Sequence, residues 1–198
     1  MGRDPDGGVD RGSPMFGYIL DSNVVITCQR ASCLQKLAAA SAVVRMAMAD
    51  DVRDELTLPP RLTDPVTAKM KEFAQALLAS SIEVIEIPAE SPEHDMRDAL
   101  KRMVGAGEAA SIAVALQRPD LIFVTEDIKA VEGEKLKLYR ELPGEVGRIM
   151  GLHAFLRVLF DRGAITAQVA TAISTAGVRS NGPPLWWAAW VAALPRDT

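Results

Sequence analysis

The stretch Tyr18-Ile-Leu-Asp-Ser-Asn-Val-Val-Ile26 decides how this chain can fold. The run from Phe16 to Leu20 predicts a buried strand that stops abruptly at Asp21. Ser22 and Asn23 can cap a following helix, because short polar side chains accept hydrogen bonds from the free N–H groups of a first turn. Asp21 would then lie at the carboxyl end of an early strand, where open α/β sheets place their active groups. Taken alone, Asp21 is better explained as a turn or capping residue.

Composition favours one main domain. The sequence has 198 residues, of which 48% are hydrophobic, and this supplies one full-sized core rather than two. A net charge of −4 gives no global basic signature for nucleic acid, although a local basic rim can still surround an acidic metal site. Cys28 and Cys33 have no further Cys or His cluster beside them, which favours neither a zinc site nor a disulfide framework. We expect two buried thiols in a reduced, cytoplasmic protein.

The two ends of the chain differ from its middle. Residues 1–15 are rich in Gly, Asp, Pro and Arg and lack the apolar core of a signal peptide, so we expect a disordered tail. Residues 16–178 form the predicted domain, and residues 179–198 form a Pro- and Trp-rich extension. The apolar run of the extension is far shorter than the roughly 20 residues that span a bilayer, which indicates no membrane segment. It predicts either a short helix docked on the body, which we favour, or a partner or dimer contact.

Strand and helix patterns alternate through most of the chain, and no internal repeat is visible. This alternation predicts an α/β fold, a three-layer α/β/α sandwich with a mainly parallel central sheet. After the first strand, the predicted strands cover residues 43–48, 82–87, 121–125 and 146–150. The helical patterns cover residues 24–40, 50–56, 65–78, 91–104, 108–116, 153–160 and 166–176.

Three later segments also place an acid at a suggestive point. Glu55 is next to Leu56, on or near the apolar side of its helix, where an unpaired carboxylate is costly. Glu108 opens an alanine-rich helix, where the helix dipole favours an acid even without function. The sequence Thr125-Glu-Asp127 ends a wholly apolar run that predicts a buried strand. As at Asp21, a carboxylate would therefore lie at the carboxyl end of a buried strand.

Four motifs together resemble the ordered acidic motifs of PIN-domain nucleases over about residues 16 to 178. They are Leu20-Asp21-Ser-Asn23, Val52-Arg-Asp-Glu55-Leu, Gly107-Glu108-Ala-Ala and Val124-Thr-Glu-Asp127. The resemblance implies an α/β/α sandwich and a magnesium- or manganese-dependent ribonuclease, in many members the toxin half of a bacterial toxin–antitoxin pair. The partners it implies are an RNA substrate and an antitoxin protein, and we also expect a homodimer.

The resemblance also implies roles, position by position. Asp21, Glu55, Glu108 and Asp127 would be the four catalytic acids. Of these, Asp21, Glu108 and Asp127 would hold the metal. The supporting residues Asn23 and Thr125 would orient ligands or water.

The chemistry can be argued from the residues as well. Hydrolysis of a phosphodiester needs an activated water and neutralised phosphate charge, and divalent ions supply both. Magnesium prefers carboxylate oxygens, and neither histidine stands in a strand-end motif, which points away from zinc. Like charges about 4 Å apart repel by about 4 kcal/mol at an effective dielectric constant of about 20. Converging carboxylates are therefore more easily understood as a metal site than as structure.

Other classes of protein stay open. A phosphorylated receiver domain also has an acidic magnesium pocket with a Thr and a Lys nearby, as at Thr125 and Lys129, but it carries paired acids after its first strand and Asp21 is single. A haloacid-dehalogenase-type phosphatase requires a second Asp two residues after the first, where this chain has Asn23. The third alternative is a PIN-like fold that serves mainly as a binding module.

Overall fold

The computed structural model describes residues 16–58, 67–126, 149–177 and 183–194, and the fold is described over these ranges. Five strands in this part of the chain form one parallel sheet in the order β3-β2-β1-β4-β5. Their bounds are β1 Gly17–Leu20, β2 Met46–Ala49, β3 Glu83–Ile85, β4 Leu121–Thr125 and β5 Ile149–Gly151. Asp127 and residues 1–15 lie outside the described residues.

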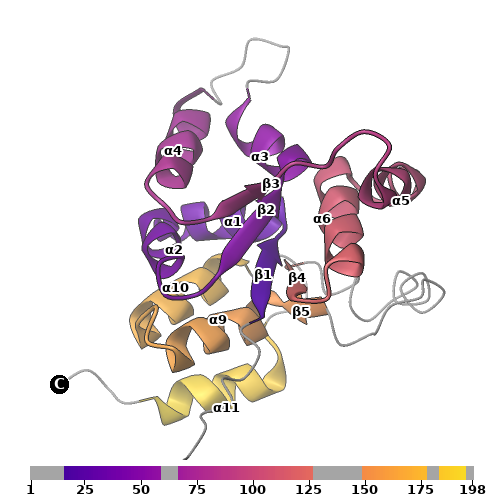
Figure 1. The fold of residues 1–198 in the computed structure, drawn as a ribbon. Helices are drawn as coiled ribbons and strands as arrows, with labels where there is room; N and C mark the ends of the chain where they lie inside the picture. The colour runs from indigo at the N-terminus through magenta and orange to yellow at the C-terminus, as the bar shows by residue number, and fades with distance from the viewer. Residues whose placement is uncertain (1–15, 59–66, 127–148, 178–182, 195–198) are drawn as a thin grey trace, which may run out of the picture.

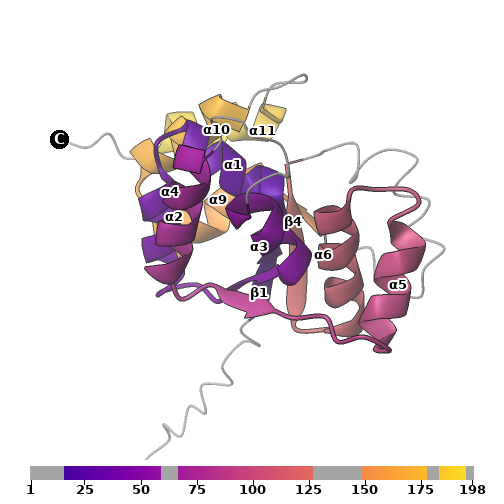
Figure 2. The same ribbon diagram turned by 90° about the horizontal axis from the view of Figure 1, so that it is seen from above.

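Helices flank both sides of the sheet. Figures 1 and 2 show α5 and α6 on one side, and α9, α10 and α11 on the other. The bounds are α1 Ser22–Arg30, α2 Leu34–Ala40, α3 Asp50–Thr57, α4 Thr67–Leu78, α5 Pro92–Leu100, α6 Ala106–Gln117, α9 Leu152–Asp161, α10 Ala167–Gly177 and α11 Leu185–Ala193. The predicted three-layer α/β/α architecture is confirmed.

The central strands are buried because they are apolar on both faces. All residues of β1 and β2 are buried, as expected for strands covered by helices on both sides. The Tyr18 ring of β1 packs against Phe155 of α9 with ring centroids 5.2 Å apart. The predicted thiols Cys28 and Cys33 are both free and buried. β1 therefore holds the middle of the core, and its carboxyl end is fixed in place.

Three predicted helix boundaries are wrong. The pattern over residues 24–40 is broken into α1 and α2 at Ser32, whose φ of 55° is incompatible with a continuing right-handed helix. The helix predicted over residues 91–104 ends at Leu100, and Met103 is 51% exposed rather than buried. The next helix begins at Ala106, two residues before Glu108, and so includes Gly107 in its first turn.

The C-terminal extension contains a helix docked on α9. Trp187 is 3% exposed, and its ring lies 4.9 Å from His153 and 4.6 Å from Trp190. Leu185 and Trp186 stay outside, 95% and 42% exposed. No helix in the described ranges combines the length and apolar character needed to cross a bilayer.

The docking of α11 can be tested by truncating its two neighbouring tryptophans separately. Trp187→Ala should lower the free energy of unfolding by about 3 kcal/mol, because it empties a buried aromatic site. Trp186→Ala is the control and should cost less than Trp187→Ala, because the Trp186 side chain is 42% exposed and Trp187 only 3%. Urea denaturation of both variants measures the difference, and equal losses would contradict the docked arrangement.

Candidate active site

Asp21 is the residue around which the candidate site is built. It ends β1 and occupies the N-cap position of α1, with φ −72° and ψ 151°. Its backbone N–H donates to Val124 O at 3.0 Å, and its backbone carbonyl accepts from Val24 N at 3.1 Å. Its side chain makes no capping hydrogen bond to α1. The capping explanation therefore accounts for the position of Asp21 and leaves its carboxylate for another use.

Three side-chain donors surround that carboxylate. Thr125 Oγ1, at the end of β4, donates to Asp21 Oδ2 at 3.1 Å, and Asn23 Nδ2 donates to the same oxygen at 3.3 Å. Ser22 Oγ lies 3.4 Å from Oδ1, a long and weak contact. Asp21 is 2% exposed and Thr125 is 0% exposed. The structure thus brings together Asp21, Asn23 and Thr125, and it adds Ser22, which the sequence suggested only as a cap.

The surroundings of Asp21 make the charged form of its carboxyl group less favourable than it is in water. Burial raises the pKa of the Asp21 carboxyl, and the hydrogen bonds from Thr125, Asn23 and Ser22 oppose this only in part. The negative charge of Glu55 raises the same pKa further. Glu55 therefore lies within electrostatic range of Asp21, although it belongs to a different element.

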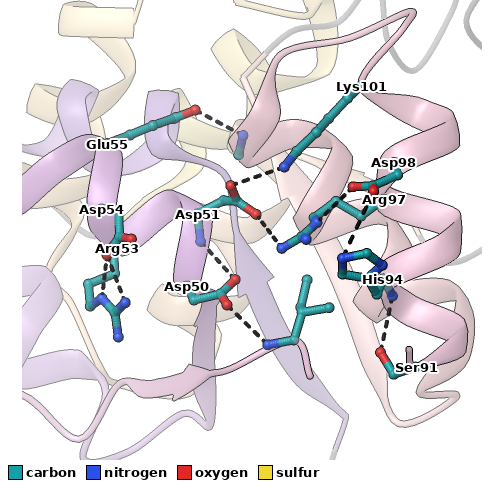
Figure 3. Close-up of polar contacts among 12 residues, drawn as sticks. Asp50, Asp51, Arg53, Asp54, Glu55, Ser91, His94, Arg97, Asp98 and Lys101 are labelled. Atoms are coloured by element: carbon teal, nitrogen blue, oxygen red, sulfur yellow. Dashed lines mark hydrogen bonds and ion pairs between the residues drawn. The ribbon is translucent and has the colours of Figure 1, made fainter. Parts of the chain in front are cut away.

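Glu55 reaches the site from α3. The expectation that it lies on the apolar side of its helix is wrong, because the structure leaves it exposed while its neighbours Val52 and Leu56 are buried. Its Oε1 accepts a hydrogen bond from the backbone N–H of Gly107 at 2.9 Å, and Figure 3 shows the side chain extended toward the start of α6. The N-cap residue of α6, Gly105, has no side chain, so Glu55 serves a free donor of this helix from outside.

Of the two remaining acids, Glu108 and Asp127, only Glu108 lies within the described residues. Glu108 is half-buried in the first turn of α6, directly after the residue that binds Glu55. Asp127 is outside the described residues. Within the described part of the chain, no three Asp, Glu, His or Cys side chains gather closely enough to hold a metal ion. The convergence of four acids therefore stays a prediction: Asp21 and Glu55 lie within electrostatic range of each other, and Glu108 lies next to the residue that binds Glu55.

Glu126 is an acid that the sequence did not single out. Thr27 Oγ1 of α1 donates to its Oε2, and Thr27 is fully buried. A Cβ atom built at Gly177 of α10 would lie 2.9 Å from Glu126 Oε1. Thr125 ends β4 and contacts Asp21, whereas Glu126 follows the strand and faces α1 and α10. The contacts of Glu126 join segments distant in sequence, so the apolar spacing gives no signal for them.

An ion-pair cluster lies one helical turn before Glu55 on α3. Asp51 Oδ2 accepts from Arg97 Nη1 of α5 at 3.0 Å, and Asp51 Oδ1 lies 3.5 Å from Lys101 Nζ. Figure 3 shows Arg97 and Lys101 converging on this carboxylate. The Arg97 side chain is 14% exposed, which makes this pair less screened than a surface one. The cluster fixes α5 to α3 and places two cations beside the acidic site.

The side chains of the candidate site are of the type that binds a hard divalent ion. Asp21 offers a desolvated carboxylate, and Glu108 offers a second carboxylate on a neighbouring element. Oxygen ligands of this type suit magnesium or manganese and not zinc. A cation would also relieve the unfavourable burial that raises the pKa of Asp21.

Comparison of this chain with protein-family models, curated proteins and solved structures found no match. The resemblance to PIN-domain nucleases therefore rests on the four acidic motifs.

The burial of Asp21 predicts a characteristic pH dependence of stability. Since its folded-state pKa is raised above 3.8, the folded protein binds the proton more tightly than the unfolded chain does, and stability is lost as pH rises from 3.8 through the folded-state pKa. Asp21→Asn should therefore stabilise the metal-free protein at neutral pH, with a gain that shrinks toward zero as pH falls to about 4. Urea denaturation between pH 4 and pH 8 in chelator measures this gain.

Asp120→Asn is the matched control, because the Arg45 hydrogen bond lowers the pKa of Asp120. For a lowered pKa the sign reverses: the carboxylate contributes stability above pH 3.8 that is lost as pH falls through its folded-state pKa. Asp120→Asn should thus destabilise the protein at neutral pH. A neutral-pH loss for Asp21→Asn as well would show that its hydrogen bonds outweigh its burial.

Proposed function

We propose that this chain is a divalent-metal-dependent endoribonuclease that hydrolyses RNA phosphodiester bonds. The observation that carries the proposal is the Asp21 carboxylate, which is 2% exposed at the carboxyl end of the central strand and does not cap its own helix. Thr125 of the neighbouring strand holds it, and Glu55 is close enough to raise its pKa. Buried, perturbed acids at the carboxyl ends of parallel strands are typical of functional sites.

Each residue has a role that its surroundings support. Asp21 and Glu108, with Asp127 by resemblance, would hold magnesium or manganese, which when bound supplies an activated water and neutralises phosphate charge. Thr125 and Asn23 fix the orientation of the Asp21 carboxylate through hydrogen bonds to Oδ2. Gly107 binds Glu55 Oε1, and the Glu55 carboxylate would accept a proton from an attacking water.

The proposed substrate class is RNA, as the resemblance to PIN-domain nucleases implies. Arg97 of α5 and Lys101 at its C-terminal end pair with Asp51, one turn before Glu55 on α3, and these cations would lie near a phosphate backbone that approached the acids. We extend the proposal to the toxin half of a toxin–antitoxin pair, with an antitoxin and a second copy of the chain as partners. A small antitoxin-like reading frame next to this gene would support that extension.

A binding module without catalysis is the second candidate. The observation that favours it is the bond between Glu55 and Gly107, which would serve as a helix cap even in an inactive protein. In that case RNA or protein binding would persist in chelator and would not depend on the charge of Asp21.

The nuclease proposal predicts metal-dependent cleavage of RNA by the purified protein. Cleavage of single-stranded or structured RNA should require magnesium or manganese and stop in chelator. Asp21→Asn should slow it at least about a hundredfold, the scale on which one preorganised electrostatic group contributes. Asp120→Asn changes an acid at the opposite end of the sheet, paired with Arg45, and should cleave at nearly the wild-type rate. Undiminished cleavage in chelator would exclude the mechanism.

A further inference from the structure

Gly107 and Glu55 form a contact that only glycine permits. We propose that Gly107 is a positioning residue, which holds the carboxylate of Glu55 at the mouth of the acidic site through its backbone N–H and its missing side chain. This inference rests on the proposed nuclease function and adds a residue that touches neither metal nor substrate.

The carboxylate lies directly over the Cα atom of Gly107. A Cβ atom built there would be 2.7 Å from Glu55 Oε2, 2.9 Å from Cδ and 3.0 Å from Oε1. Contacts this short do not persist between real atoms, so any other residue at position 107 would push the whole carboxylate group away. The hydrogen bond from Gly107 N to Oε1, at 2.9 Å, would be lost or stretched by the same movement.

The requirement is steric and local. Among the described glycines, only Gly163 has a positive φ, so Gly107 is not needed for its backbone conformation. Gly105, two residues earlier, has an ordinary φ of −61° and no atom within 4 Å of a built Cβ. Within one helical turn, a side chain at Gly107 would therefore clash with Glu55, whereas a side chain at Gly105 would clash with nothing.

The surrounding elements leave little room for α3 to move instead. Asp51, one turn before Glu55, is held by Arg97 and Lys101 of the α5 segment that leads into α6. Because α3 is anchored to that segment, a new methyl group at position 107 is accommodated by displacing the Glu55 side chain. The displacement would alter the position of this acid relative to Asp21, whose pKa responds to the charge of Glu55.

The test compares Gly107→Ala with Gly105→Ala in single-turnover cleavage at saturating RNA and metal. A displacement of roughly 0.5–1 Å in a reacting group lowers rates by about 10- to 100-fold. We expect that loss in the rate constant of Gly107→Ala, with RNA affinity changed less than about threefold. Gly105→Ala should match the wild type. Trp187→Ala, which weakens the fold far from the acids, should also keep the wild-type rate and so controls for stability.

A second readout needs neither metal nor substrate. Gly107→Ala should leave the melting temperature of the metal-free protein unchanged or slightly lower, because the displaced Glu55 carboxylate and the lost hydrogen bond offset the better helix propensity of alanine. In a Glu55→Ala background the same change should raise the melting temperature, because no carboxylate remains to clash and only the gain in helix propensity is left. If Gly107→Ala does not fold, Glu55→Asp withdraws the carboxylate with Gly107 intact and should show the same loss of rate.

The outcomes separate the two proposals. Wild-type cleavage with an equally fast Gly107→Ala or Glu55→Asp variant would overturn the positioning role and leave the nuclease standing. A wild type that neither binds manganese nor cleaves RNA would overturn the nuclease. In that case, a non-additive effect of the Gly107 and Glu55 substitutions on the melting temperature would show only that Glu55 caps α6. The positioning role would then be rejected together with the nuclease function.

Discussion

The rest of the site depends on one buried carboxylate. Asp21 is held where β1 and β4 end together, because their parallel register pairs Leu20 with Val124 and so sets Asp21 beside Thr125. An ionised carboxylate at this depth is costly, and hydrogen bonds from the Thr125 and Asn23 side chains and from the Ser22 backbone offset only part of the cost. The sheet could have avoided this by ending β1 in an apolar residue. A central strand that ends in a desolvated acid is a constraint that stability alone does not explain.

A second acid is presented in the opposite way. Glu55 is exposed and enters from a helix, so its position depends on how α3, α5 and α6 are joined rather than on the sheet. The Asp51 ion pairs and the Glu55–Gly107 hydrogen bond lie one turn apart along α3. The ion pairs hold the end of α5 and the hydrogen bond holds the start of α6, so both ends of the connection between these helices are bound to α3. The two carboxylates thus differ in hydration while remaining within electrostatic range, an arrangement suited to different tasks.

The sequence predicted the parts of the fold that depend on local pattern. The apolar run Leu121–Thr125 is β4 with the same bounds, because its short length, the Pro119-Asp120 before it and its β-branched and aromatic residues favour a buried strand over a helix. The break at Ser32 was not predictable, since a left-handed residue between two helices leaves no mark in apolar spacing. Glu55 lies three residues after the buried Val52, on the flank of the apolar face, and its long side chain reaches past that face to Gly107, so helical spacing did not reveal its exposure. The Gly107 contact joins segments distant in sequence, and only the fold reveals it.

The residues at the start of α6 are not those that would make this helix most stable. Glycine within a helix is less favourable than alanine by about 0.5–1 kcal/mol, and a Ser or Asp at the N-cap would have served the free donors without help from α3. The chain instead has Gly105 at the cap and Gly107 in the first turn, and it takes its acceptor from Glu55. If α6 needed only a cap, position 105 could have provided one, because a side chain there would meet nothing within 4 Å. What a local cap could not provide is a carboxylate held from another helix beside Asp21. The glycines are therefore better explained by the placement of Glu55 than by the stability of α6.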